Sequence, residues 1–333
     1  MTERPIVVIG GSGFIGTCLV RSLQDRSARQ VRIVDKVVSR SFPDLTDLAD
    51  VRSPQALQGV IPDGAVLVNL AAEHRDDVTP RSLYREVNVE GARNVCQIAR
   101  DRGVQTIVFT SSVAVYGFAP VGTSESGAIN PFNDYGRTKY EAEQIYRSWQ
   151  AEAPEQRTLV IVRPTVVFGE QNRGNVYNLL RQIASGRFAM IGDGRNRKSM
   201  AYVNNVAAFL AYALSFQPGV YVYNFIDKPD FTMEALVGIV SRSLGRANAF
   251  RLKIPFALGY LFGCCCDIAG RVTGRKFAIS AIRVRKFCAD SVYETAIEQT
   301  GFVAPVSLSD ALERTVRFEF LEKHEHREVF ISE

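Results

Sequence analysis

The chain has 333 residues, of which 46% are hydrophobic and 23% are charged, and its formal net charge is +5. This length supplies one large domain or two closely joined ones with an extensive core, and the composition is that of an ordinary globular protein. No run interleaves basic with aromatic residues, so nothing favours nucleic-acid binding, although a slightly basic surface suits an anionic substrate.

The first predicted elements are a strand and a helix joined by a glycine-rich turn. The strand, Ile6–Ile9, shows no polar alternation, which is typical of a buried parallel strand. Gly10 allows a tight bend, Gly13 lets backbone N–H groups approach a pyrophosphate, and Gly16 lets the helix pack closely on the strand. The helix, which begins at Phe14, offers unpaired N–H donors and a positive dipole end. Together these features predict a dinucleotide site.

A second apolar strand, 31–34, ends in Asp35. It stands about 20 residues after the glycines, where a dinucleotide-binding unit places an acid on the adenosine ribose. A carboxylate there accepts from two ribose hydroxyls and repels a 2′-phosphate, so NAD is favoured over NADP. Lys36 and Arg40 lie close in the chain and leave NADP open.

Two further segments are expected to meet the cofactor. Asp50 and Val51 are predicted to contact the adenine ring, with a helix cap as the equal alternative for this position. The buried strand 65–70 runs into Ala71 and Ala72, and such small residues suit a cofactor lying across the sheet edge.

A long helix is predicted over 82–102, ending at Gly103. Asn88 and Gly91 lie inside it although neither is a strong helix former, which indicates a packing or bonding role.

The residues with catalytic chemistry follow. Strand 106–110 ends at a serine pair, and Tyr135 and Lys139 lie one turn apart on a helix over 135–152. A free phenol is a poor base at neutral pH, but the Lys139 ammonium and an oxidised nicotinamide are expected to lower the pKa of Tyr135. Tyr135 would then take a proton from a sugar hydroxyl, a serine would hold the reacting oxygen, and Lys139 would bind the nicotinamide ribose.

The alternation of strands and helices as far as a strand at 159–162 predicts an α/β, Rossmann-type, doubly wound parallel sheet. Beyond Gly169 the pattern becomes mixed, which predicts a smaller α/β substrate domain. The expected division is a cofactor domain at 1–168, a substrate domain at 169–318 that returns some elements to the first, and a charged tail at 319–333 that extends a final helix.

One apolar segment, 254–266, is too short to span a bilayer, which takes about 20 residues. A buried or surface-docking helix is favoured, with peripheral membrane contact as the alternative. Its three adjacent cysteines, Cys264, Cys265 and Cys266, are interpreted as small apolar fillers.

The six cysteines and three histidines show no metal-ligand spacing, so no metal site is expected. The N-terminus leads directly into the first strand without a signal peptide, and a cytoplasmic location is expected.

Taken together, the motifs resemble those of the extended short-chain dehydrogenase/reductase family, in its NAD-dependent nucleotide-sugar epimerase and dehydratase group. The resemblance covers nearly the whole chain and rests on residues 10–16, 69–74, 111–117, 135–139 and 163–169.

The resemblance implies specific roles. The catalytic residues would be Ser112, Tyr135 and Lys139. The cofactor residues would be Gly10, Gly13, Phe14, Ile15, Gly16, Asp35, Lys36, Asp50, Val51, Leu70, Ala71, Ala72, Asn88, Tyr135, Lys139, Pro164 and Val166. The substrate residues would be Glu73, Ser111, Asn175, Lys198 and Arg283. A UDP-sugar is the implied substrate, and a homodimer through helices 82–102 and 135–152 is the implied assembly.

The reaction stays open between alternatives. A 4,6-dehydratase needs an acid pair directly after the catalytic hydroxyl, where this chain has Val113 and Ala114. That leaves oxidoreduction at C4, by a 4-ketoreductase of a 4-keto-6-deoxy-N-acetylhexosamine or by a UDP-glucose or UDP-N-acetylglucosamine 4-epimerase with tightly held NAD, either serving surface polysaccharide synthesis. Lys198 favours the reductase and Asp35 the epimerase. A non-enzymatic redox sensor is the third alternative, although such proteins tend to lose the tyrosine or the lysine.

Overall fold

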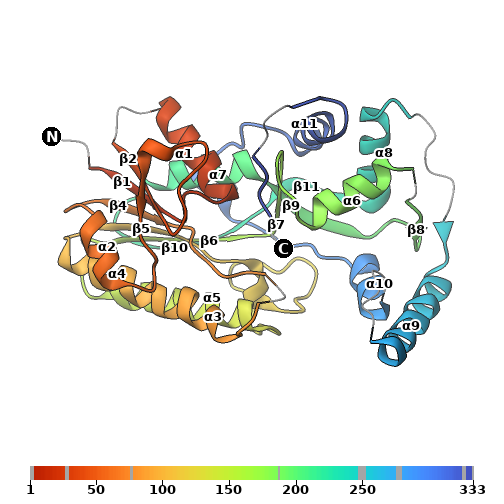
Figure 1. The fold of residues 1–333 in the computed structure, drawn as a ribbon, viewed down its shortest axis with the longest axis horizontal. Helices are drawn as coiled ribbons and strands as arrows, with labels where there is room; N and C mark the ends of the chain where they lie inside the picture. Colours follow the sequence, from red (N-terminus) through yellow and green to blue (C-terminus); the bar gives the residue numbers. More distant parts are fainter. Residues whose placement is uncertain are drawn as a thin grey trace.

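The structure is a computed structural model that describes residues 4–26, 30–75, 78–186, 188–246, 253–274, 280–324 and 328–331. Its larger part is a sheet of seven strands with helices on both faces (Figure 1). The strands run in the order β10 (Gly219–Phe225), β6 (Thr158–Pro164), β5 (Thr106–Thr110), β4 (Val66–Asn69), β1 (Ile6–Ile9), β2 (Val31–Asp35) and β3 (Thr46–Leu48). Every neighbouring pair is parallel, which confirms the predicted doubly wound sheet.

Both faces of this sheet are covered. One face carries α1 (Phe14–Arg26) and α7 (Val203–Ala213), and the other carries α2 (Pro54–Val60), α4 (Gly91–Asp101) and α5 (Asp134–Ala151) (Figure 1). Within β1, Val7 and Ile9 join the core under α4 and α5, whereas Ile6 and Val8 join the core under α1 and α7. Burial on both faces explains why the strand is apolar at every position.

The helix predicted over 82–102 is helical throughout but not uniform. It consists of α3 (Ser82–Tyr84), a π-helical turn η2 (Arg85–Glu90) and α4. Gly91 lies at the end of the π turn, where a Cβ atom would stand 3.0 Å from a methyl carbon of Val51. Helical π turns often occur at functional sites, and this one holds the buried Asn88.

The C-terminal part is mixed. Three strands pair in the order β11 (Asp227–Thr232), β9 (Arg197–Tyr202) and β7 (Val166–Phe168), and two more pair as β12 (Lys253–Ile254) and β8 (Met190–Ile191). The helices of this part are α6 (Asn175–Ala184), α8 (Met233–Ser243), α9 (Phe256–Thr273), α10 (Ala281–Cys288) and α11 (Leu308–Phe320), and α9 and α10 form a hairpin at one end of the molecule (Figure 1). Short 3-10 turns complete the list as η1 (Pro43–Leu45), η3 (Val113–Tyr116) and η4 (Ile297–Thr300).

Two expectations for the C-terminal part need correction. The final helix does not extend along the tail, because α11 ends at Phe320 and the described residues 328–331 lie outside any helix. The cysteine run is not simple core filling, because Cys265 is exposed on α9. Among the described residues, no helix combines the length and the apolar composition needed to cross a bilayer.

Candidate active site

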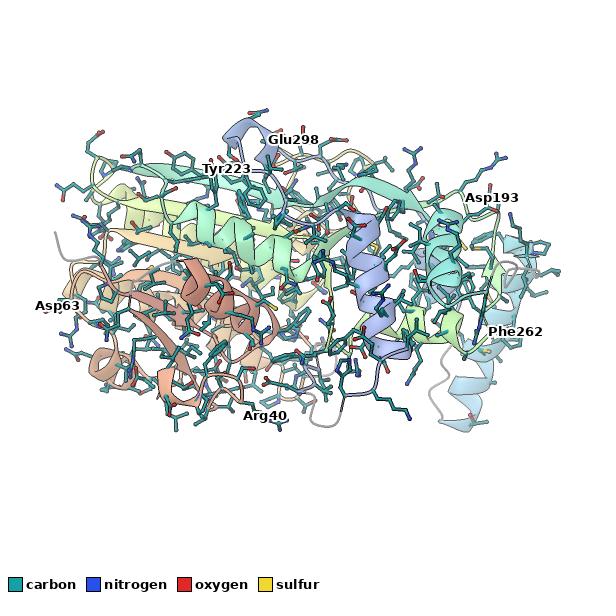
Figure 2. All side chains as sticks on the ribbon, turned by 90° about the horizontal axis from the view of Figure 1, so that it is seen from above. Arg40, Asp63, Asp193, Tyr223, Phe262 and Glu298 are labelled. Atoms are coloured by element: carbon teal, nitrogen blue, oxygen red, sulfur yellow. The ribbon has the colours of Figure 1, made fainter. Side chains whose placement is uncertain are left out.

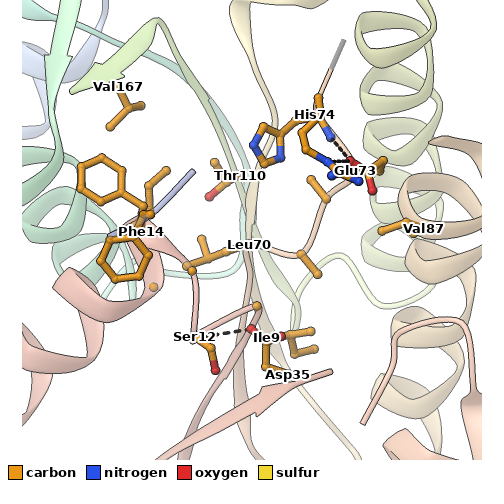
Figure 3. Close-up of a pocket in the computed structure, with 18 of the residues that line it drawn as sticks. Ile9, Ser12, Phe14, Asp35, Leu70, Glu73, His74, Val87, Thr110 and Val167 are labelled. Atoms are coloured by element: carbon orange, nitrogen blue, oxygen red, sulfur yellow. Dashed lines mark hydrogen bonds and ion pairs between the residues drawn. The ribbon is translucent and has the colours of Figure 1, made fainter. Parts of the chain in front are cut away.

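A cavity of about 870 Å³ lies at the carboxyl ends of the central strands. It is centred where the chain crosses from β3, on one side of β1, to β4 on the other, the position at which open α/β sheets bind ligands. The predicted residues that line it are Gly10, Gly13, Phe14, Ile15, Gly16, Asp35, Lys36, Asp50, Val51, Leu70, Ala71, Ala72, Glu73, Ser111, Ser112, Tyr135, Lys139, Pro164, Val166 and Asn175. Figure 3 labels Phe14, Asp35, Leu70 and Glu73 among them. Asn88, Lys198 and Arg283 do not line it.

The glycine-rich turn has the close backbone packing that a dinucleotide site requires. Gly10 has a φ of +78°, and a Cβ atom there would lie 2.6 Å from the Ala71 nitrogen. At Gly16, a Cβ atom would lie 2.5 Å from the Cα atom of Gly11. These contacts hold the start of α1 against the sheet edge, so its free N–H groups face the cavity.

The Asp35 carboxylate is fixed at the cavity by backbone donors. Ser12 N donates to Oδ2 at 3.0 Å and Val37 N donates to Oδ1 at 3.3 Å (Figure 3). The Ser12 hydroxyl donates to the Val37 carbonyl at 2.8 Å and closes the loop. A carboxylate held in this way fits the two hydroxyls of an adenosine ribose.

Asp50 and Val51 line the same end of the cavity. The alternative role as a helix cap belongs to another residue, because the Ser53 side chain accepts from Ala56 N at the start of α2. Asp50 instead pairs with Arg52 at 2.7 Å. The hydrogen bond from Arg52 is the main reason that the pKa of Asp50 is lowered.

The acid–base residues are brought together by the packing of η3 on α5. Asn133 caps α5 by accepting from Gly136 N at 2.9 Å. A Cβ atom at Gly136 would lie 2.4 Å from the Ala114 carbonyl, so only glycine lets η3 approach this closely. Ser112 caps η3 by accepting from Ala114 N at 3.1 Å, and its side chain is close enough to the Tyr135 phenol to oppose the rise of the phenol's pKa.

Lys139 lies one turn beyond Tyr135, almost fully buried, with Nζ 4.2 Å from the centre of the Phe109 ring. Burial lowers the pKa of Lys139 to about 7, against the opposing charge of Glu143. Burial raises the pKa of Tyr135 to about 12, against the opposing effect of the Ser112 side chain. Burial therefore outweighs the expected lowering of the Tyr135 pKa in the protein alone. The expectation counted on Lys139 and the oxidised nicotinamide together, and the nicotinamide would add its positive charge only when bound.

Ser111 and Ser112 are neighbours with different partners. Ser111 borders the cavity, but its hydroxyl donates to Glu143 at 2.5 Å. Glu143 forms a buried pair with Arg163 at 2.6 Å, and Arg163 donates to the Tyr116 hydroxyl at 2.7 Å. Ser111 therefore belongs to a buried polar network that supports the site, and its place at the cavity leaves the expected substrate contact a prediction.

Asn88 has a positioning role in place of the cofactor contact expected for it. Its side chain accepts from Glu73 N at 2.9 Å and donates to the Glu73 carbonyl at 3.0 Å and to Thr138 Oγ1 at 2.9 Å. The π turn thus ties the segment after β4 to α5, close to Tyr135. Glu73 lines the cavity, and its Oε1 atom lies 3.2 Å from Arg75 Nε (Figure 3). Burial acts to raise the pKa of Glu73, but the hydrogen bond and the charge of Arg75 lower it overall.

The positions expected for Lys198 and Arg283 also need correction. Lys198 Nζ donates to the carbonyls of Lys286 and Ala289, at 2.9 and 2.6 Å, at the C-terminal end of α10. Carbonyls at a helix end attract an ammonium, which explains its position. Arg283 is exposed on α10, so neither cation has the expected place at the cavity.

Some cavity residues were not predicted. Phe330 lies beside the glycine-rich turn, with its ring centre 5.7 Å from that of Phe14. Its backbone pairs with residues 171–173, and Glu328 accepts from the Ser41 hydroxyl at 2.7 Å. A charged tail carries no pattern that indicates such a return. Thr110 also faces the cavity, and its buried hydroxyl has no partner among the described residues (Figure 3).

The chain matches a known protein family and is similar to known epimerases. The model of the NAD dependent epimerase/dehydratase family matches residues 6–224. The N-acetyl-alpha-D-glucosaminyl-diphospho-ditrans,octacis-undecaprenol 4-epimerase of Escherichia coli O157:H7 is 46% identical over 98% of this chain and 99% of its own length. The UDP-glucose 4-epimerase of Vibrio cholerae is 29% identical over 81% of this chain and 86% of its own.

Solved structures share the fold. The UDP-N-acetylglucosamine 4-epimerase from Bacillus cereus has a TM-score of 0.74 and 15% identity, covering 96% of this chain and 100% of its own. The UDP-glucose 4-epimerase of Thermus thermophilus, solved with NAD, has a TM-score of 0.70 and 20% identity, covering 94% of this chain and 98% of its own.

Proposed function

Because the chain belongs to the NAD-dependent epimerase/dehydratase family, we propose that it inverts C4 of an N-acetylhexosamine carried on a polyprenyl diphosphate. The protein is an NAD-dependent enzyme of the sugar-diphosphate 4-epimerase group. The proposal for its sugar and carrier is supported by the 46% identity, over nearly the full length, to an epimerase that acts on such a lipid-linked sugar. The observation that carries the chemistry is that Ser112, Tyr135 and Lys139 line one cavity together with the glycine-rich turn.

Three side chains of this chain handle the proton at the sugar oxygen. Tyr135 takes the proton of the C4 hydroxyl and returns it to the same oxygen after the sugar has presented its other face. Ser112, which lines the cavity beside Tyr135, holds that oxygen in reach. Lys139, in its ammonium form, stabilises the phenolate and binds a ribose hydroxyl.

When bound, NAD would accept a hydride from C4 of the sugar and later donate it back to the same carbon. The fixed Asp35 carboxylate and the tightly packed glycine-rich turn fit its adenosine ribose and pyrophosphate. Epimerisation returns the hydride to the sugar, so it needs no added reductant. A 4-ketoreductase would use one equivalent of reduced cofactor for each product, which makes the two reactions easy to separate.

The experiment uses the purified full chain with N-acetylglucosamine linked through diphosphate to a polyprenol in detergent, and in parallel with UDP-N-acetylglucosamine. No reductant is added. After mild acid release, chromatography measures the two C4 epimers. We expect the same equilibrium mixture from either starting epimer of the lipid-linked sugar, with faster turnover than for the UDP-sugar.

Conversion of the UDP-sugar alone would contradict the proposed carrier but keep the reaction. A product that forms only with consumption of NADH or NADPH would identify a reductase and contradict the epimerase. The matched control is Tyr135→Phe, which retains the ring and its packing but removes the hydroxyl that moves the proton.

A further inference from the structure

The α9 helix is attached to the protein through its smallest residues. A Cβ atom at Gly259 would lie 2.6 Å from a methyl carbon of Ile191, and one at Gly263 would lie 2.7 Å from the Ala281 nitrogen. These two glycines stand one turn apart, so they form one face of the helix, and that face packs on β8 and on the start of α10. The large side chains of α9 must therefore point elsewhere.

They point to the surface. The exposed fractions are 59% for Leu258, 61% for Leu261, 57% for Phe262 and 62% for Ile268. Figure 2 shows Phe262 at the end of the molecule opposite Asp63. A helix of a water-soluble core places its large apolar residues inward and its small or polar ones outward, and α9 does the reverse. Contiguous exposed apolar residues of this kind mark an interaction site.

The exposed charges on α10, which packs beside α9, are positive. Asp267, the one acidic residue of α9, is turned to the hairpin and accepts from Ala281 N at 3.0 Å. On α10, Arg285 and Lys286 are exposed, and Ile282 adds an exposed apolar side chain. Apolar residues flanked by exposed cations, without exposed acids on the same helices, match the surface of an anionic bilayer.

A cation of α10 contacts two exposed aromatic rings near the acid–base pair. Lys286 Nζ lies 4.9 Å from the centre of the Phe132 ring and 5.9 Å from that of Phe118. The two rings are exposed and stack at 4.7 Å. Phe132 precedes Tyr135 by three residues, and Phe118 follows η3. The Lys286 ammonium therefore connects α10 with the loops that flank the catalytic groups.

We propose that the exposed face of α9, together with the cations of α10, docks the protein on an anionic lipid bilayer as a helix lying in the interface. Docking of this kind rests on the proposed function for its substrate. A polyprenyl diphosphate is held in a bilayer, and the sugar that it carries stands at the bilayer surface. Docking by α9 would place the Phe118–Phe132 pair at the lipid side, next to the polyprenyl chain.

The experiment is flotation of the full-length protein with vesicles of phosphatidylethanolamine and phosphatidylglycerol, and with vesicles of phosphatidylcholine alone. We expect the wild type to float with the anionic vesicles and to bind the neutral ones more weakly. Leu261→Glu should reduce the bound fraction about tenfold or more, since it replaces a leucine that enters the lipid by a charge.

The matched control is Val303→Glu, which places the same charge on another exposed apolar residue, 83% accessible, in the loop between η4 and α11. It should float like the wild type. Thermal unfolding of both variants, and their turnover of UDP-N-acetylglucosamine, should match the wild type, because Leu261 lies outside the cavity.

Flotation of Leu261→Glu equal to that of the wild type would overturn the proposal, as would a wild type that stays with the soluble fraction. A Leu261→Glu protein that changes from dimer to monomer in light scattering, without any lipid effect, would show that a second copy covers the face. Epimerisation without flotation would refute docking alone, whereas flotation without epimerisation would refute the proposed function alone.

Discussion

The helices α1 and α9 both pack through glycines, but they turn their large apolar side chains in opposite directions. Both contain glycines that touch backbone or side chains closely, Gly16 against Gly11 and Gly263 against Ala281. In α1 the large apolar residues are buried, with Leu19 at 0% exposure, whereas in α9 Leu261 is at 61%. In these two helices, the more apolar one exposes its large side chains because its glycines occupy the face that packs on the protein.

The α1 end of the molecule carries the chemistry and the α9 end carries the proposed docking, so variants should separate them. The largest effect is expected for Tyr135→Phe, which should lower turnover about 10²- to 10⁴-fold because the group that moves the proton is lost. Cofactor binding and vesicle flotation should match the wild type. Near-normal turnover would reject the assignment of Tyr135.

A matched pair of leucines tests the comparison directly. Leu19→Ala in α1 should lower the free energy of unfolding by about 2–5 kcal/mol, because it leaves a cavity in the core. Leu261→Ala in α9 should change the free energy of unfolding by about 0.5 kcal/mol or less, because the side chain is exposed. Chemical denaturation measures both. Equal losses would mean that the α9 face is buried in solution.

A smaller effect is expected at the ribose end of the cavity. Asp35→Ala should reduce the preference for NAD over NADP by about tenfold, because two hydrogen bonds to a charged acceptor are lost. Dissociation constants for both cofactors measure the change. Asp35→Asn is the matched control, because it removes the charge of the side chain and keeps its shape.

The smallest effect is expected on the α9 side. Arg285→Gln should weaken binding to anionic vesicles about fivefold, since one cation near such a surface contributes roughly 1 kcal/mol. The effect should vanish at high salt, where the charges are screened. Flotation across a salt series checks this, and an effect that persists in high salt would indicate a contact of another kind.

The sequence predicted the elements whose signal is local. Continuous apolar strands, the glycine turn and the Tyr135–Lys139 spacing all depend on neighbours within a few residues, and each lies where expected. No element was predicted for α7, because it is buried nearly all round and has no polar face to give a helical period.

Side-chain partners far apart in the chain were not predictable in this way. Lys198 was expected at the substrate, and its ammonium instead donates to carbonyls at the end of α10. Asn88 was correctly singled out as unusual within its helix, but its partner Glu73 became visible only in the fold. A residue type and its position in an element do not determine which carbonyl or carboxylate the packing brings near.

The return of Phe330 to the glycine-rich turn also sets an order of assembly. Phe14 leaves the ribosome early, whereas residues 328–331 follow nearly everything else that borders the cavity. The rim beside Phe14 is therefore the part finished last during synthesis, and a nascent chain that already has its sheet still lacks one wall around the dinucleotide.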